Sequence, residues 1–284
     1  MVISGKTRVV GVWGYPVGHS RSPAMHNAAI AALGLDWVYV PFAVAPVAVA
    51  EAVAGIRALG MLGVNVTVPL KQAVIPYLDE IDPVAERLGS VNTIVNRDGI
   101  LTGYSTDGPG FLWDLADNGV SFEGKRVLIW GAGGASRAVA AALAERDCRV
   151  TVANRTLARA RDVASLAGQG ASAVEWGGEA YDEAVAGAEL LVNTTSLGMT
   201  PASVNEMPFV KPGALHAGQV VYDLVYAPER TRLLVEASAA GCRAIGGLGM
   251  LVRQGAVSLA YWANLDLADV PVECMAAALT AAAS

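Results

Sequence analysis

Residues 127–143, VLIWGAGGASRAVAAAL, pass from a short apolar strand through a glycine-rich turn into an alanine-rich helix. This order is typical of the first unit of a dinucleotide-binding sheet. Gly131 allows the tight turn, and Gly133 lets backbone N–H groups approach a pyrophosphate at the helix N-terminus. The third position of the G-x-G-x-x-G pattern holds Ser136, which is small but not glycine. Because an ordinary strand–helix turn can carry the same glycines, the motif needs support from its surroundings.

Outward from this turn, strand and helix patterns alternate along most of the chain. This alternation predicts an α/β protein with parallel sheets built from right-handed βαβ units, in two blocks of which the second begins near residue 107. A hairpin turn is expected at Asp98-Gly99. Ser22 is expected to cap the first helix. Strands are expected at 7–14, 37–44, 62–68, 125–130, 149–156, 188–195 and 219–226, and helices at 22–34, 47–60, 76–89, 111–119, 134–147, 157–168 and 250–265.

The strand that follows the glycine turn ends in VANRT, residues 152–156. An NAD-binding fold places an acidic residue near this point, against the ribose 2′-hydroxyl. Here Asn154, Arg155 and Thr156 stand instead, with Arg159 one helical turn further on. A guanidinium and a hydroxyl suit a 2′-phosphate, which a carboxylate would repel. The sequence therefore predicts NADP as the cofactor.

A second informative stretch, LGVNVTVPLK, covers residues 62–71. Strand alternation predicts that Val64, Val66 and Val68 pack into the core while Asn65 and Thr67 face the other way. Lys71 follows the proline that ends the strand. This strand and the turn after it are expected to bring an amide, a hydroxyl and an ammonium together at the end of the sheet.

Further polar residues occur where other strands are predicted to end, in GHSRSP, GSVNT and GYSTDG. The loops after parallel strands form the ligand crevice of open α/β sheets. Amides, hydroxyls and one Lys/Asp pair suit a small polyol acid. No His/Cys/Asp cluster has the spacing of metal ligands, so no metal is expected, and the three histidines are expected to be structural. The residues concerned are Ser20, Ser22, Asn92 and Asp107, with Asn65, Thr67 and Lys71.

The composition narrows the class of function. The formal net charge is −6, and no long Lys/Arg block occurs, which argues against nucleic acid or an anionic membrane as a partner. The three cysteines are far apart and fit a reducing compartment. The N-terminal stretch does not read as a signal peptide, and no apolar run is long enough to span a bilayer. We expect a cytoplasmic protein that acts on small molecules.

Together these motifs resemble the shikimate dehydrogenase family along nearly the whole chain. The matching segments are GHSRSPAMHN, NVTVPLK, GSVNTIV, STDG, GAGGASRA, NRT, NTTSLGM, YDLVYAPERT and GLGMLVRQGA. The resemblance implies a substrate domain, residues 1–106 completed by 247–284, and a Rossmann-type NADP-binding domain, residues 107–246. It also implies reversible NADPH-dependent reduction of 3-dehydroshikimate to shikimate in chorismate and aromatic amino-acid biosynthesis, by a monomer or homodimer.

The resemblance also implies roles for individual residues. Lys71 and Asp107 would form the catalytic acid–base pair. The substrate would be held by Ser20, Ser22, Asn65, Thr67, Asn92, Tyr226 and Gln254. The pyrophosphate would lie against Gly131, Gly133, Gly134 and Ala135, and the 2′-phosphate against Asn154, Arg155, Thr156 and Arg159. The nicotinamide side would be shaped by Asn193, Thr194, Thr195, Ser196, Met199, Gly247 and Met250.

Two positions depart from the commonest family pattern: Ser105 replaces an asparagine, and Gly247 replaces a frequent aspartate. Alternatives inside the family are a quinate/shikimate dehydrogenase that uses NAD and an aminoshikimate dehydrogenase-like paralogue. An alternative from another class is a non-catalytic sensor of a nucleotide and a small acid. The presence of both Lys71 and Asp107 argues against that sensor, because a protein that only binds needs no acid–base pair.

Overall fold

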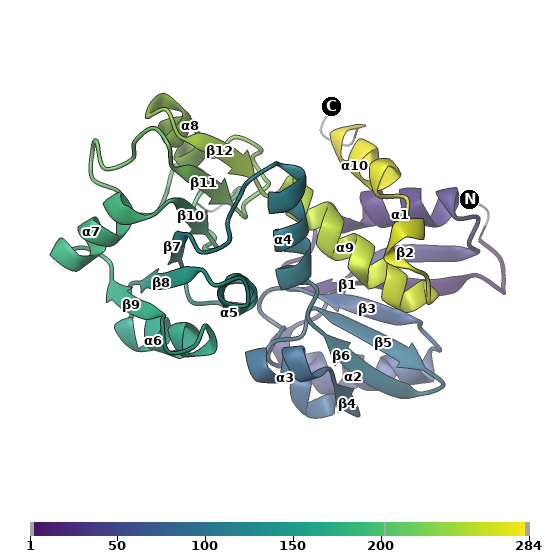
Figure 1. Cartoon of the computed structure of the whole chain (residues 1–284). Helices are drawn as coiled ribbons and strands as arrows, with labels where there is room; N and C mark the ends of the chain where they lie inside the picture. Colours follow the sequence, from purple (N-terminus) through teal and green to yellow (C-terminus); the bar gives the residue numbers. More distant parts are fainter. Residues whose placement is uncertain (1–2, 202, 282–284) are drawn as a thin grey trace. The chain divides into compact units, whose positions relative to one another are not determined.

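The computed structural model describes residues 3–201 and 203–281. The chain forms two compact units, one from Met1–Gly110 with Leu251–Ser284 and the other from Phe111–Met250. Each unit is built on one six-stranded sheet, so the predicted α/β class with two open sheets is confirmed (Figure 1).

The sheet of the first unit has the strand order β2-β1-β3-β5-β6-β4. Strands β1 to β3 are parallel, but β5 runs antiparallel to both β3 and β6. The expected parallel pairing therefore holds for β1 to β3 but not for β5, because the Asp98-Gly99 turn, with positive φ at both residues, folds β5 and β6 into the predicted hairpin. The strands are β1 Arg8–Gly14, β2 Trp37–Ala43, β3 Gly63–Val66, β4 Glu80–Ile81, β5 Thr93–Arg97 and β6 Ile100–Tyr104.

Helices from both ends of the chain pack in this unit, and α10 lies against α1 (Figure 1). The helix predicted over 76–89 is wrong in its first half. The chain there makes the short turn η2 and then β4, which pairs with β6. Asp82 then accepts hydrogen bonds from Val84 and Ala85 and starts a shorter helix. The helical elements are α1 Ser22–Ala32, η1 Pro46–Ala48, α2 Val49–Ala58, η2 Ile75–Tyr77, α3 Pro83–Leu88, α9 Leu248–Ala263, η3 Leu267–Asp269 and α10 Val272–Ala281.

The strand that carries Asn65 is shorter than predicted. Val64 and Val66 are buried, but Val68 is 70% exposed. The expectation that Val68 packs into the core is therefore wrong. The chain leaves the sheet after Val66, and the Leu70 N–H bonds the Thr67 carbonyl in a turn. The alternation of strand faces ends with the strand.

The second unit has an all-parallel sheet with the order β12-β11-β10-β7-β8-β9. Apolar clusters cover both faces of it, one around Ile129 and Val192 and the other around Leu128 and Leu191. The sequence pattern missed β9, α7, α8 and β12 here, as it missed α10. The elements are α4 Asp107–Asp117, β7 Arg126–Trp130, α5 Gly134–Ala144, β8 Arg149–Asn154, α6 Leu157–Leu166, β9 Ser172–Glu175, α7 Glu179–Gly187, β10 Leu190–Asn193, β11 Val220–Asp223, α8 Arg232–Ala239 and β12 Arg243–Gly246.

Among the described residues, no helix has the length and apolar character needed to cross a membrane.

Candidate active site

A lysine–aspartate pair lies in the first unit. The Lys71 Nζ is 2.5 Å from the Asp107 Oδ2, and the two side chains are 15% and 8% exposed. Lys71 stands in the turns that follow β3, and Asp107 is the first residue of α4. An ion pair this close to full burial is worth forming only if the remaining oxygen of the carboxylate is also hydrogen-bonded.

Asn92 supplies that hydrogen bond. Its Nδ2 donates to the Asp107 Oδ1 at 2.8 Å and to the Thr106 hydroxyl at 2.9 Å. Its Oδ1 accepts from the Thr106 backbone N–H at 2.8 Å. The Gln254 Oε1, on α9, lies 3.4 Å from the same amide nitrogen. The structure thus brings Lys71, Asp107, Asn92 and Gln254 together, and it adds Thr106, which the sequence did not single out.

Asn65 contacts this group through the Asn92 carbonyl and is 7% exposed. Its Oδ1 accepts from the Tyr39 hydroxyl at 2.8 Å. Its Nδ2 donates to the Asn92 carbonyl, to the Thr93 hydroxyl and, at 2.9 Å, to the Ser258 hydroxyl. Every polar atom of this side chain has a protein partner. Asn65 was predicted to be a substrate-binding residue, whereas its observed contacts link β3 to β2, β5 and α9.

We therefore expect Asn65→Ala to act on stability. The change leaves the buried hydroxyls of Tyr39 and Ser258 without the Asn65 amide, and a buried polar group that loses its partner costs about 1–3 kcal/mol. The free energy of unfolding, measured by urea denaturation, should fall by that order. Tyr39→Phe removes one of the same bonds and should cost less. An Asn65→Ala protein of unchanged stability but raised substrate KM would contradict this assignment.

Ser20 and Ser22 lie around the start of α1. Ser22 is the first residue of the helix rather than its N-cap; that position is held by Arg21 without a side-chain cap bond. The predicted cap is therefore wrong by one position, and the Ser22 backbone N–H instead donates to the Ser20 hydroxyl at 3.3 Å. Thr67 is half-buried, and its hydroxyl has no hydrogen-bond partner within the described part of the chain. These hydroxyl groups remain available to a ligand.

The glycine turn in the second unit leaves open space at the N-terminus of α5. Gly131 has φ +111°, and a Cβ there would meet the Thr194 side chain. A Cβ on Gly133, the N-cap of α5, would meet open space. The Ser136 hydroxyl, fully buried, donates to the Gly131 carbonyl at 2.7 Å. Ser136 therefore closes the turn, which explains a hydroxyl at the third position of the motif. Gly134 and Ala135 open the helix that follows.

The end of β8 exposes cationic groups. The Asn154 side chain donates to the Thr156 carbonyl at 3.1 Å. Arg155 and Arg159 are exposed, and neither has an ion-pair partner in residues 3–201 and 203–281. Thr156 is the N-cap of α6 but its side chain makes no cap bond. Two guanidinium groups, a free hydroxyl and a helix N-terminus suit a phosphate group. The sequence pattern did not foresee Glu175, which pairs with Asn154 in the β8–β9 register.

The loop after β10 is held by side chains. The Asn193 Oδ1 accepts from the Thr195 N–H and hydroxyl at 3.0 and 2.7 Å. The Thr194 hydroxyl donates to the Trp130 carbonyl at 2.7 Å. In the same loop the Met199 N–H bonds the Ser196 carbonyl. The Asn193 Nδ2 donates to Asp223, a fully buried acid that sequence reasoning passed over although it stands in the YDLVY motif.

The remaining predicted residues of the second unit lie near the ends of β11 and β12. A Cβ on Gly247 would overlap the Leu224 carbonyl oxygen, so an aspartate does not fit there in this chain. Met250 is 6% exposed and belongs to the apolar core. Tyr226 is half-buried in the loop after β11. The departure at Gly247 is thus a packing requirement, whereas nothing in the structure explains Ser105.

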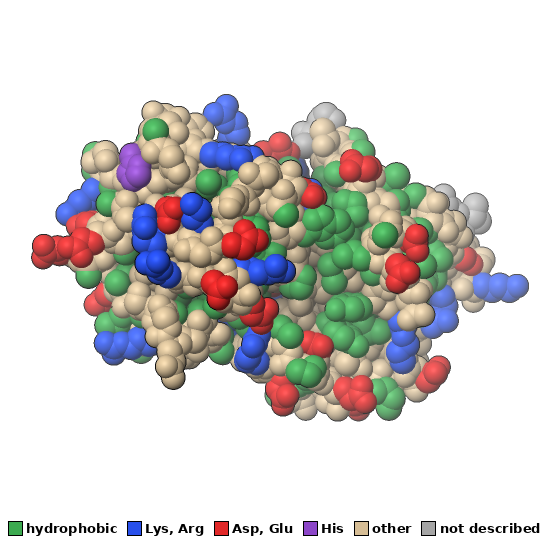
Figure 2. Space-filling model, in the orientation of Figure 1, with side chains coloured by type: hydrophobic (Ala, Val, Ile, Leu, Met, Phe, Trp, Pro, Cys, Tyr) green, Lys and Arg blue, Asp and Glu red, His purple; other side chains and the backbone are tan. Residues whose placement is uncertain are grey.

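Residues 3–201 and 203–281 contain no cluster of His, Cys, Asp or Glu that could hold a metal ion. Burial lowers the pKa of His26 to about 3, and its ring stacks on Tyr39 at 4.2 Å, which fits the structural role expected for it. On the face shown in Figure 2, Lys and Arg side chains are interspersed with Asp and Glu rather than gathered in one patch.

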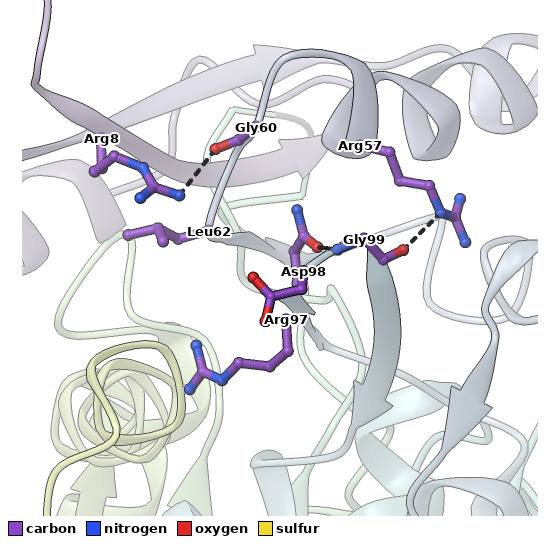
Figure 3. Close-up of a pocket in the computed structure, with 8 residues that line it drawn as sticks. Arg8, Arg57, Gly60, Leu62, Arg97, Asp98 and Gly99 are labelled. Carbon is purple, nitrogen blue, oxygen red and sulfur yellow. Dashed lines mark hydrogen bonds between the residues drawn. The ribbon is translucent and has the colours of Figure 1, made fainter.

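A separate pocket of about 330 Å³ lies in the first unit, lined in part by Arg8, Arg57, Arg97 and Asp98. Figure 3 shows Asp98 between Arg8 and Arg97, while the Arg57 side chain points away from both. Arg57 forms an ion pair with Asp79. The pocket lies at the start of β1 and the end of β5. Lys71 follows the end of β3 and Asn92 precedes the start of β5, so both lie at the other edge of the sheet.

Comparison with known proteins identifies the family of this chain. Residues 12–94 match the shikimate dehydrogenase substrate binding domain, and residues 114–200 match the shikimate/quinate 5-dehydrogenase domain. The NADP(+)-dependent shikimate dehydrogenase of Moorella thermoacetica is 50% identical over 269 residues, which cover 93% of this chain and 90% of that protein. The chain belongs to the shikimate dehydrogenase family.

Solved members of the family agree. A shikimate dehydrogenase in complex with NADP+ superposes with a TM-score of 0.92 at 39% identity, over 100% of this chain and 98% of that one. The Thermus thermophilus shikimate 5-dehydrogenase, solved with shikimate, gives 0.85 at 37% identity, over 97% and 98%. A Corynebacterium glutamicum quinate dehydrogenase with NAD gives 0.87 at 30%, over 97% and 99%. The fold is therefore shared by enzymes that differ in substrate and cofactor.

Proposed function

We infer that the chain catalyses the reversible NADPH-dependent reduction of 3-dehydroshikimate to shikimate. The observation that carries the chemistry is the Lys71–Asp107 ion pair, held at 2.5 Å and braced by Asn92. Relatives named as NADP(+)-dependent shikimate dehydrogenases, at 43–50% identity over most of the chain, support the substrate and the cofactor. A sensor that only binds these molecules would need no such pair.

In the proposed reaction Lys71 supplies the proton. When bound, the nicotinamide supplies the hydride to the ketone carbon. Negative charge then grows on the ketone oxygen, where the Lys71 ammonium stabilises it and donates the proton. Asp107 orients the ammonium, and Asn92 fixes Asp107 through the second carboxylate oxygen. In the direction of shikimate oxidation the same lysine takes the proton back.

The remaining groups position the substrate. Ser20, Ser22 and Thr67 offer hydroxyl groups, and Gln254 offers an amide beside Asn92. We propose that the two serines hold the substrate carboxylate and that Thr67, Asn92 and Gln254 hold ring hydroxyls. Tyr226 is proposed to approach the carboxylate. These roles follow from the family resemblance, and they are supported by the Thr67 hydroxyl, which has no hydrogen-bond partner among the described residues.

The cofactor is proposed to lie along the second unit. Its pyrophosphate would meet the N–H groups at Gly133, Gly134 and Ala135, where a helix N-terminus and open space favour an anion. Its 2′-phosphate would meet Arg155, with Thr156 and Arg159. The loop after β10 would hold the nicotinamide side.

A spectrophotometric assay tests the function. Purified protein should oxidise NADPH when 3-dehydroshikimate is added, and should do so far more slowly with NADH. Absence of turnover with 3-dehydroshikimate, in protein that still binds NADPH, would favour the paralogue that acts on an amino derivative.

Two further properties are predicted from the sequence alone. The protein is expected to be a monomer or a homodimer, and it is expected to lie in the cytoplasm.

The serines give a separate prediction. Ser20→Ala and Ser22→Ala each remove a hydroxyl that bonds the carboxylate in both the ground and transition states, so the KM for shikimate should rise by ~10-fold with kcat within about threefold. Because the Ser22 side chain makes no cap bond, its removal should leave the melting temperature nearly unchanged. A large drop in melting temperature with normal KM would contradict both statements.

A further inference from the structure

The last residue of β11, Asp223, is an acid with no access to solvent. Its Oδ1 accepts from the Asn193 side chain at 2.8 Å and from the Val225 backbone N–H at 3.0 Å. Its Oδ2 accepts from the Thr231 hydroxyl at 2.6 Å. Burying a carboxylate costs free energy unless its oxygens are hydrogen-bonded, and here both are. The hydrogen-bonded carboxylate lies where the loops 193–199 and 224–231 leave the sheet.

The partners of Asp223 belong to those two loops. Through Asn193 it reaches the Thr195 N–H and hydroxyl, which fix the start of the loop 193–199. The Asn193 side chain also donates to the Leu197 carbonyl at 3.3 Å. Through Thr231, the N-cap of α8, it fixes the far end of the loop 224–231. One carboxylate therefore sets the path of both loops.

We propose that Asp223 is a positioning residue for the nicotinamide end of the bound cofactor. It acts through Asn193, whose side chain holds the loop 193–199, and it touches neither cofactor nor substrate itself. This inference rests on the proposed NADP-dependent function and deepens it. The proposal predicts that loss of Asp223 weakens binding of the nicotinamide half of the cofactor and leaves binding of the adenosine half unchanged.

Within residues 3–201 and 203–281, the hydrogen bonds to the Asp223 carboxylate all come from uncharged groups. The groups that meet it are Asn193 from β10, Val225 from the following loop and Thr231 from the start of α8, and none of the three titrates. Its register neighbour on β12 is Gly246. The acid Asp114 bonds the hydroxyl of Tyr222, whose side chain points to the opposite face of the strand. Burial raises the pKa of the Asp223 carboxyl to about 6, although hydrogen bonds from Thr231, Val225 and Asn193 oppose the rise.

The experiment compares two ligands by calorimetry: NADPH, and adenosine 2′,5′-bisphosphate, which lacks the nicotinamide. For Asp223→Ala the Kd of NADPH should rise by ~10-fold or more, while that of the bisphosphate stays within about twofold. Asp223→Asn keeps the shape and an acceptor for Asn193, so its effect should be smaller. Asn193→Ala breaks the same link without touching the acid and should reproduce the Asp223→Ala result, which keeps the test valid if Asp223→Ala fails to fold.

Gln219→Ala is the matched control. Gln219 is equally buried, stands just before the other end of β11 and donates to the Val185 and Ala188 carbonyls. It should lower the melting temperature without separating the two ligands. Equal weakening of both ligands, or none, in folded Asp223 and Asn193 variants would overturn the proposal. A different result would overturn the proposed function: wild-type protein that binds the bisphosphate, yet binds NADPH no more tightly than NADH.

A stability measurement shows whether Asp223 titrates as its burial requires. The folded-state pKa lies above the ordinary value of 3.8, so the protonated acid favours the folded state. This contribution is fully present below about pH 4 and is lost as the pH rises through about 6. Asparagine does not titrate there. The urea midpoint of wild type relative to Asp223→Asn should therefore fall between pH 4 and 7, and a constant difference would mean that Asp223 is not the buried acid described here.

Discussion

Lys71→Ala should lower kcat for reduction of 3-dehydroshikimate by at least ~10²-fold, with a much smaller change in KM. The reason is that the ammonium acts on charge that appears at the ketone oxygen only in the transition state. Proton transfer by a positioned group is typically worth ~10²–10⁴-fold in rate. The variant also leaves Asp107 without its ion-pair partner, although Asn92 still binds its other oxygen. Steady-state kinetics on folded protein measure the effect.

Lys125→Ala is the matched control for this experiment, because Lys125 forms a lysine–carboxylate pair with Glu189 at 2.8 Å in the other unit. Its loss should leave kcat and KM unchanged. Lys71→Arg keeps the charge but not the proton donor, and we expect it to retain little activity. A normal kcat in Lys71→Ala would make Lys71 a binding or surface residue and would remove the basis of the proposed mechanism.

Arg155→Ala should lower kcat/KM with NADP by ~10²-fold while leaving the slow reaction with NAD nearly unchanged. An adenosine 2′-phosphate offers charge-assisted hydrogen bonds to a guanidinium that has no ion-pair partner among the described residues. NAD offers only a hydroxyl at that point. Because Arg155 is exposed, the preference for NADP should also weaken as the salt concentration rises.

Arg161→Ala is the control for Arg155, because it removes another exposed arginine, in the helix α6 that follows Arg155. It should leave the ratio of NADP to NAD activity unchanged. Arg159→Ala is expected to give an intermediate effect. Equal use of NAD and NADP by the wild-type protein would contradict this account of Arg155 and would move the quinate/shikimate alternative to first place.

The glycine turn and the fold around it could be predicted because their signals are local. A strand, two glycines and a helix follow one another within residues 127–143, and the parallel sheet of the second unit forms as they predict. The Asp98-Gly99 hairpin was predicted from its turn residues, but the mixed sheet that results from it was not. Short elements such as β4 and β9 escaped prediction because they depend on pairing with distant strands rather than on their own pattern.

Some residues of the candidate site could likewise be predicted from local sequence, whereas the roles of others depend on long-range contacts. Lys71 and Asp107 were foreseen as a pair because family resemblance and strand-end position agree. Asn65 has the same polar character, but long-range contacts with Tyr39 and Ser258 turn its side chain inward. Asp223 was missed for a related reason: its sequence motif shows an acid in an apolar strand, and only the fold shows which loops it joins.

The central claim is that this chain is an NADP-dependent enzyme for shikimate rather than for quinate. One set of steady-state measurements tests it most directly: kcat/KM for shikimate and for quinate, each with NADP and with NAD. We predict that shikimate with NADP exceeds each of the other three combinations by ~10²-fold or more. A kcat/KM for quinate with NAD that equals or exceeds that for shikimate with NADP would contradict the account.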